Sequence, residues 1–261
     1  MNKFNLNLGE GATNRLAFTL AEVLITLAII GVVAALTIPS VITNYQNTQT
    51  ATTLKKAYST IANTTNLAIK DHGPISGWVD DIGAYGFQSS KIYAEKYVIP
   101  YLRISKNCAN SNEPSCTHKI KFYNTSGELS SLETTNYANF YLADGTFVAI
   151  GTNNAGTGAN QFLNAQVFID VNGLKQPNTL GKDVFIYIHY LISYGKDIGG
   201  KLHPHCIHDE NLKCVLSESI NNCKKGGNNV SCAHLIMQNG WKIPSKEEYV
   251  RMGGDADKYP W

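Results

Sequence analysis

An apolar run at residues 18–38 constrains this chain more than any other feature. It reads FTLAEVLITLAIIGVVAALTI and contains one charged residue, Glu22. At about 1.5 Å per residue, a helix of this length spans roughly 30 Å, the thickness of the hydrocarbon core of a bilayer. Lys3 and Arg15 precede the run, and a positive flank keeps its side of a span in the cytoplasm. We therefore expect a single-pass inner-membrane helix whose C-terminal head is periplasmic or extracellular.

Neither a secretory signal peptide nor a plain membrane anchor explains both the length of this run and its one carboxylate. A secretory signal peptide has a shorter apolar core, followed by a small-residue cleavage site; this run is longer, and no such site follows it. A plain membrane anchor accounts for the length but not for Glu22. A carboxylate at the centre of a span costs about 2.5–3.5 kcal/mol, and less near its end. Such residues usually have a function and a partner.

The residues Ala17-Phe18-Thr19-Leu20-Ala21-Glu22 supply a third interpretation. They resemble the signature of type IV prepilins, in which a peptidase cuts before an aromatic residue and a Glu is fifth after the cut. The resemblance implies a leader at residues 1–17, cleavage between Ala17 and Phe18, and N-methylation of Phe18. It also implies that Glu22 pairs with the terminal amine of a neighbouring subunit. Ala17 departs from the family, which nearly always has Gly before the cut.

Gly31 and Pro39 stand where the helices of this family carry helix-weakening residues. Gly is about 1 kcal/mol less favourable than Ala in a helix, and Pro lacks a backbone donor. The resemblance implies a subunit of a type IV pilus or of a type II secretion pseudopilus, assembled through residues 18–38. Its partners would be a prepilin peptidase, the inner membrane and other pilin or pseudopilin subunits. The alternative is a membrane-stalked adhesin or binding module that does not polymerise.

The pattern after Pro39 predicts that the helix continues as an amphipathic segment, residues 39–72. Leu54, Tyr58, Ile61, Thr65 and Ala68 recur at three- and four-residue spacing, which indicates one packed face. His72-Gly73-Pro74 ends this helix, and a second helix is predicted at residues 87–102.

The hydrophobic period then changes to two, which predicts β-strands. The candidate strands are residues 119–123, 137–142, 146–150, 166–171 and 184–190. Asp144-Gly145 is a hairpin-turn signal, and residues 151–160 are expected to form a loop. Helices followed by an antiparallel sheet make an α+β chain, in the order of a pilin head. Residues 73–261 are predicted to form one globular head.

The six cysteines all lie in the head. An even number with short intervening loops is typical of disulfides in an oxidising compartment. Six cysteines allow 15 connectivities. Pairing of nearest neighbours is the hypothesis adopted, because each pair closes a short loop: Cys108 with Cys116, Cys206 with Cys214, and Cys223 with Cys232.

Two loops contain side chains that could hold a metal ion. Asp170, Asn172 and Asp183 could supply calcium oxygens, although the spacing also fits a turn in which these residues bond the local backbone. His203, His205 and His208 flank Cys206, but an exposed polar loop is the preferred interpretation. No cofactor other than this possible calcium ion is expected. No catalytic motif is present, so we expect no enzyme, and the formal net charge of +2 gives no reason to expect nucleic-acid binding.

Overall fold

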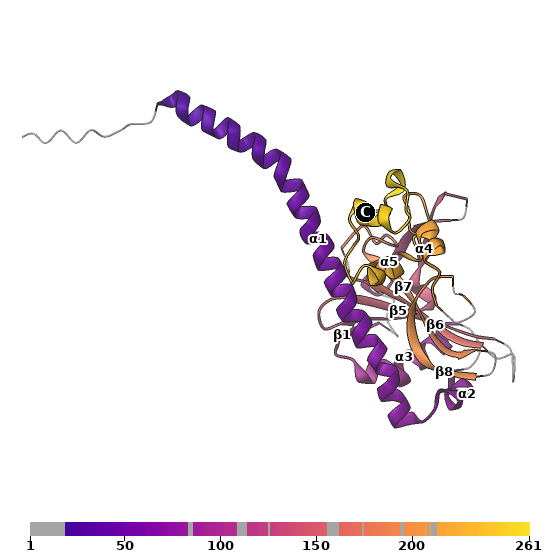
Figure 1. Ribbon diagram of the computed structural model, residues 1–261. Helices are drawn as coiled ribbons and strands as arrows, with labels where there is room; N and C mark the ends of the chain where they lie inside the picture. Colours follow the sequence, from indigo (N-terminus) through magenta and orange to yellow (C-terminus); the bar gives the residue numbers. More distant parts are fainter. Residues whose placement is uncertain are drawn as a thin grey trace, which may run out of the picture. The chain divides into compact units, whose positions relative to one another are not determined.

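The structure is a computed structural model that describes residues 19–82, 86–108, 114–124, 126–155, 162–173, 175–193, 196–207, 209 and 213–261. The chain divides into two compact units, Met1–Tyr45 and Gln46–Trp261. The long helix α1 (Leu20–His72) contributes to both (Figure 1). The division falls after Tyr45, inside the segment for which the sequence predicts an amphipathic helix. We call the second unit the head.

The head is built on a six-stranded antiparallel sheet with the strand order β1-β4-β5-β6-β7-β8. A separate hairpin is formed by β2 and β3. The strands are β1 (Ile104–Asn107), β2 (Lys119–Tyr123), β3 (Leu129–Glu133), β4 (Ala138–Leu142), β5 (Phe147–Ala155), β6 (Phe162–Asp170), β7 (Val184–Ser193) and β8 (Lys196–Pro204). The short helices are α2 (Val79–Ile82), α3 (Phe87–Tyr97), α4 (Leu216–Asn222), α5 (Cys232–Gln238) and α6 (Lys246–Arg251).

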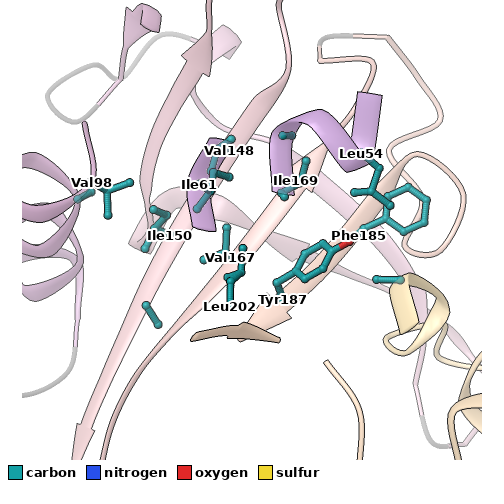
Figure 2. Close-up of a cluster of buried hydrophobic side chains, with 14 of the residues drawn as sticks. Leu54, Ile61, Val98, Val148, Ile150, Val167, Ile169, Phe185, Tyr187 and Leu202 are labelled. Atoms are coloured by element: carbon teal, nitrogen blue, oxygen red, sulfur yellow. The ribbon is translucent and has the colours of Figure 1, made fainter. Parts of the chain in front are cut away.

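The sheet is covered on both faces, so its central strands are apolar at successive positions. Val148 and Ile150 of β5 belong to a core shared with α1 and α3, which Figure 2 shows in close-up. Phe147 and Ala149 of the same strand belong to a second core. That second core includes Ile120 of the hairpin and the first pair of cysteines. Because side chains alternate across a strand, the head has three layers: helices, sheet and hairpin.

The C-terminal part of α1 packs on the sheet through the face that the sequence predicts. Its buried residues are Ala51, Leu54, Ala57, Ile61, Thr64, Thr65 and Ala68. Strand β8 comes very close to this helix at Gly200, where φ is +54° and an added Cβ would overlap Thr65 and Ile75. Only glycine adopts this backbone conformation without strain and leaves the space. The α+β fold with a long helix on an antiparallel sheet is therefore confirmed.

Several element boundaries differ from the sequence predictions. Helix α3 ends at Tyr97 instead of residue 102, because Pro100 disfavours helix at the preceding residue and lies in a short 3-10 turn. Residues 151–155, expected as loop, extend β5 and pair with β6; the rest of that loop lies outside the described residues. Strands β1, β3 and β8 were not predicted. The Asp144-Gly145 hairpin turn is confirmed, with β4 and β5 paired on either side.

Two tyrosines in the core provide a matched test of hydrogen bonding. The Tyr58 hydroxyl donates to the Leu202 carbonyl at 3.0 Å. The Tyr187 ring lies 5.2 Å from that of Tyr58 and is fully buried, and within the described residues its hydroxyl has no hydrogen-bond partner. We expect Tyr187→Phe to raise the free energy of unfolding by about 1 kcal/mol, and Tyr58→Phe to lower it by about the same amount. Thermal unfolding of the two variants checks this. A larger loss of stability in Tyr187→Phe than in Tyr58→Phe would contradict the prediction.

Candidate functional site

The start of α1 is fixed by a reciprocal set of hydrogen bonds between Thr19 and Glu22. The Thr19 backbone N–H and hydroxyl both donate to Glu22 Oε2 at 2.8 Å. The Glu22 N–H donates to the Thr19 hydroxyl at 3.2 Å. This is the geometry of a capping box. Glu22, which the sequence assigns to assembly, therefore also caps its own helix; the Thr-x-x-Glu spacing is the signal that could have revealed it.

The segment of α1 that follows is apolar on all sides and exposed. By length and composition, α1 contains a stretch able to cross a membrane. A helix that is apolar all round needs lipid or other protein to cover it. The exposed large apolar residues in this segment are Leu20, Val23, Leu24, Ile25, Leu27, Ile29, Ile30, Val32, Val33, Leu36, Ile38, Val41, Ile42 and Tyr45.

Three threonine hydroxyls inside this segment are satisfied within the helix. The hydroxyls of Thr26, Thr37 and Thr43 each donate to the carbonyl four residues earlier, at 2.9, 2.9 and 3.0 Å. Such internal bonds suit a helix in lipid, where no water is available. Gly31 and Pro39 both lie within the continuous helix. The processing residues Ala17 and Phe18, with the whole leader, lie outside the described residues.

Asp170, Asn172 and Asp183 are brought together in the turn that joins β6 to β7. Asp170 Oδ1 accepts the backbone N–H groups of Asn172 and Gly173. Asp183 accepts the N–H groups of Asn178 and Thr179 and the Asn172 side-chain amide. The two carboxylates thus bond the local backbone, as in the turn interpretation. Calcium binding here stays a prediction.

The three disulfides of the structure are Cys108–Cys116, Cys206–Cys214 and Cys223–Cys232, the nearest-neighbour pairs. Cys206 is therefore engaged with Cys214, next to His203 and His205; His208 lies outside the described residues. Within the part of the chain that the structure describes, no group of three or more His, Cys, Asp or Glu residues is placed to hold a metal ion.

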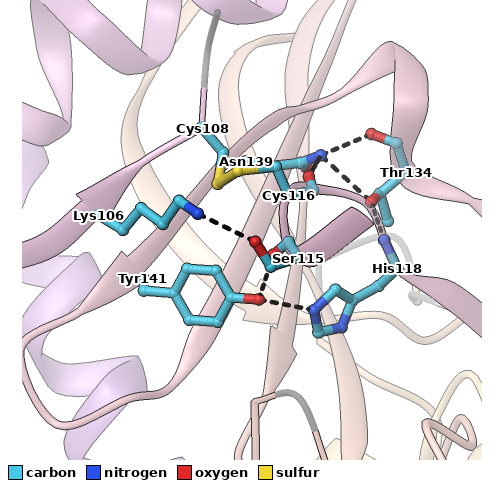
Figure 3. The surroundings of a disulfide bond; sticks show 8 residues. All are labelled: Lys106, Cys108, Ser115, Cys116, His118, Thr134, Asn139 and Tyr141. Atoms are coloured by element: carbon cyan, nitrogen blue, oxygen red, sulfur yellow. Dashed lines mark hydrogen bonds between the residues drawn. A yellow bond between two sulfur atoms is a disulfide. The ribbon is translucent and has the colours of Figure 1, made fainter. Parts of the chain in front are cut away.

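A buried polar network, missed by the sequence analysis, joins the hairpin layer to the sheet (Figure 3). His118 lies 3.2 Å from Asp170 Oδ2 through Nδ1 and 3.0 Å from the Tyr141 hydroxyl through Nε2. The Tyr141 hydroxyl donates to the Ser115 carbonyl at 2.5 Å. Burial raises the pKa of Asp170, with the His118 hydrogen bond opposing it, and burial raises the pKa of Tyr141 to about 12. Ionisable groups are thus concentrated at this layer boundary.

A second buried histidine lies on the opposite face of the sheet. His189 Nε2 is 2.5 Å from both the Gly200 carbonyl and the Thr65 hydroxyl, and Nδ1 is 2.8 Å from the Tyr93 hydroxyl. Since the carbonyl can only accept, Nε2 carries the proton and Nδ1 accepts from Tyr93. Burial lowers the pKa of His189 to about 4. This neutral ring connects α1, α3, β7 and β8.

An open groove of about 700 Å³ lies beside the start of the head. Its walls are the first head residues of α1, the Asp144-Gly145 turn and the β6–β7 turn. Its lining includes the amides Gln46, Asn47, Gln49, Asn172 and Gln176. Such a surface can exchange hydrogen bonds with a polar partner, and the described residues that line it include none of the aromatic side chains common in small-molecule pockets.

Comparison with known proteins identifies both parts of the chain. Residues 13–38 match the prokaryotic N-terminal methylation motif, the signal of type IV pilin and pseudopilin precursors. Residues 40–249, most of the chain, match a family of unknown function (DUF6613). No curated protein and no solved structure matches the chain. The protein therefore belongs to this family of unknown function, DUF6613, and carries the N-terminal motif of a type IV pilin-like precursor.

Proposed function

We propose that the protein is a structural subunit, not an enzyme, of an extracytoplasmic filament: a type IV pilus or a type II secretion pseudopilus. The observation that carries the proposal is an exposed helix, apolar on every side, with one carboxylate at its start. In this proposal a prepilin peptidase cuts between Ala17 and Phe18, and the inner membrane holds residues 18–38 before assembly. The disulfides support a head in the periplasm or outside the cell, where such bonds persist.

The exposed apolar side chains require a cover both in the precursor and in the filament. Leaving them in water would cost about 25 cal/mol per Å² of apolar surface. Lipid covers them in the precursor, and the equivalent helices of other subunits cover them in the filament. Val41, Ile42 and Tyr45 are 63%, 49% and 69% exposed and lie beyond the predicted span. We assign these three residues to contacts with neighbouring subunits.

Glu22 supplies the register of assembly. Both local hydrogen bonds from Thr19 reach Oε2, and within the described residues none reaches Oε1. The carboxylate thus keeps a free oxygen for the charged amine of a neighbouring Phe18. In a low-dielectric filament core an unpaired charge is costly, so subunits that align Glu22 with this amine are favoured over those that do not.

Mass spectrometry of the membrane-extracted protein tests processing. We expect a mature chain that begins at N-methylated Phe18. Ala17→Gly is expected to increase the processed fraction, since it restores the residue usual in the family. Ala17→Leu, with a large side chain before the cut, is expected to leave most of the protein uncut. An intact Met1 terminus in the native host, or an unmethylated start elsewhere, would contradict the proposal.

The alternative, a membrane-stalked binding module, is favoured by one observation, the open amide-lined groove of the head. Mechanical shearing of cells separates the two functions. A filament subunit leaves the cells in polymers that sediment at high speed, whereas a stalked module stays in the membrane fraction. A cytoplasmic-membrane protein with a single span serves as the control for membrane breakage in the same sample.

A further inference from the structure

A small pocket of about 110 Å³ lies in the head, at the place where β4 ends and β5 continues. The pairing of the two strands stops at Ala138 and Ile150, whereas β5 runs on to Ala155 in its pairing with β6. In place of a strand partner, the Thr152 N–H donates to Ser90 Oγ of α3 at 3.0 Å. The walls of the pocket come from the start of α3, the segment before β4, and strands β5 and β6. Among the described residues, it shares none with the larger amide-lined groove.

The described lining of this pocket is polar and carries no charged side chain. The hydroxyl-bearing residues Ser90 and Thr152 are each 1% exposed. Gln166 is half-buried, and the amides of Asn136 and Asn153 are exposed. A charged ligand would lose its hydration here without gaining an opposite charge, which is costly. The lining therefore favours a ligand that is polar and neutral.

The hydrogen bonds within the lining leave one acceptor and one donor available. The Ser90 hydroxyl donates to the Gly86 carbonyl at 2.8 Å, and its oxygen accepts the Thr152 N–H. Thr152 Oγ1, 3.4 Å from Ser90 Oγ, can thus only donate to it and keeps its own lone pairs. The Tyr137 hydroxyl donates to Gln166 Oε1 at 3.5 Å, which leaves Gln166 Nε2 as a donor. Hydroxyl groups can both donate and accept, whereas a carboxylate only accepts and an ammonium group only donates.

The size of the pocket matches a few hydroxyl groups. One water molecule occupies about 30 Å³ in the liquid, so the pocket corresponds to about four waters. A ligand gains affinity over these waters only when its own groups reproduce their hydrogen bonds. Neighbouring hydroxyls on a rigid ring do so with little loss of conformational freedom. The Tyr137 ring adds an apolar surface for the C–H groups of such a ligand. An added Cβ at Gly151 would overlap this ring, so glycine is needed to keep the ring in place.

We propose that this pocket binds one neutral sugar unit at the end of a glycan. Thr152 Oγ1 accepts from one hydroxyl of the sugar, and Gln166 Nε2 donates to a neighbouring one. One edge of the sugar ring enters the pocket, and the exposed amides of Asn136 and Asn153 bond the part that stays outside. The site does not depend on assembly: it would serve a filament subunit and a membrane-stalked module equally.

Titration of the full-length chain with free sugars tests the proposal. The chain is held in phosphocholine micelles, which carry no sugar, and the probes are glucose, galactose, mannose and N-acetylglucosamine. Saturation-transfer nuclear magnetic resonance reports binding. We expect at least one probe to bind with a Kd on the order of millimolar, as for a ligand of about twelve non-hydrogen atoms. Sodium acetate is the charged comparison. Absence of binding by all four sugars at roughly ten times that concentration, or equal competition by acetate, would overturn the proposal.

Variants of the lining locate the bound sugar. Gln166→Glu keeps an acceptor for the Tyr137 hydroxyl but has no donor, and Thr152→Val replaces the hydroxyl by a methyl group of similar size. Each is expected to weaken sugar binding about tenfold, because a hydroxyl of the sugar is left without its partner. Asn63→Ala, which removes an exposed amide of α1 outside the pocket, should bind as the wild type does. If Thr152→Val does not fold, Gln166→Glu, at a half-buried position, decides alone. Binding that is unchanged in Gln166→Glu would mean that the sugar lies elsewhere, and the proposal would be wrong.

Discussion

Glu22→Ala is expected to leave the protein in the membrane and to abolish its recovery in sheared filaments. Removal of one carboxylate makes the helix more apolar, so insertion into lipid becomes easier. Assembly loses the only charge at residues 18–38, and the amine of each neighbouring Phe18 would then be buried without a partner. A buried charge that loses its partner costs about 3–5 kcal/mol. At every subunit contact, this corresponds to a factor of roughly 10² to several 10³ in affinity.

Glu22→Gln separates the two roles of this side chain. Gln can replace Glu in a capping box, so the bonds from Thr19 and the start of α1 are kept while the charge is lost. If charge pairing drives assembly, Glu22→Gln fails as Glu22→Ala does. If helix capping alone matters, Glu22→Gln assembles normally and the pairing mechanism is wrong. Glu10→Ala is the matched control, because Glu10 lies in the predicted leader and would be absent from the filament.

The sequence predicts the parts of the fold that local pattern determines. The end of α1 at His72 and the strand β2 at 119–123 were predicted to the residue, because a Gly-Pro stop and an alternating apolar pattern mark them. Strand β8 carries the sequence KDIGGKLHP, with two glycines and little alternation. Its strand conformation comes from pairing with β7, and tertiary context of this kind outweighs intrinsic β-propensity.

In the candidate site, too, some residues are revealed by local sequence pattern and others only by the fold. Glu22 and the cysteine pairs are recognisable because their partners or motif residues lie within nine positions along the chain. His118 and His189 have partners 52 and 124 residues away, which only the folded chain brings together. Asp170 was singled out as a candidate calcium ligand, which stays a prediction, whereas its contact with His118 could not be read from the sequence.

Acidification from about pH 6.5 to pH 4 is expected to lower the free energy of unfolding through His189. Its pKa is about 4 in the folded chain because the ring is fully buried, against about 6.5 when unfolded. Within this window the unfolded chain takes up a proton that the folded chain does not. The stabilisation is complete above about pH 6.5 and is lost as pH falls through 4. Between pH 6.5 and pH 4 the free energy of unfolding therefore falls by about 3 kcal/mol.

Denaturant unfolding of the full-length chain in detergent at pH 7, 5.5 and 4 measures this loss, and His189→Gln isolates it. Gln can donate to the Gly200 carbonyl and accept from Tyr93 but cannot take up a proton. We therefore expect this variant to be less stable at pH 7, because the ring leaves a gap, and to lose less stability on acidification. The loss of stability attributed to His189 is the difference between the wild-type and the His189→Gln dependence of the free energy of unfolding on pH. His72→Gln, at the exposed end of α1, should follow the wild-type profile. An acid loss that persists in His189→Gln would have to arise from other groups, and the assignment to His189 would be wrong.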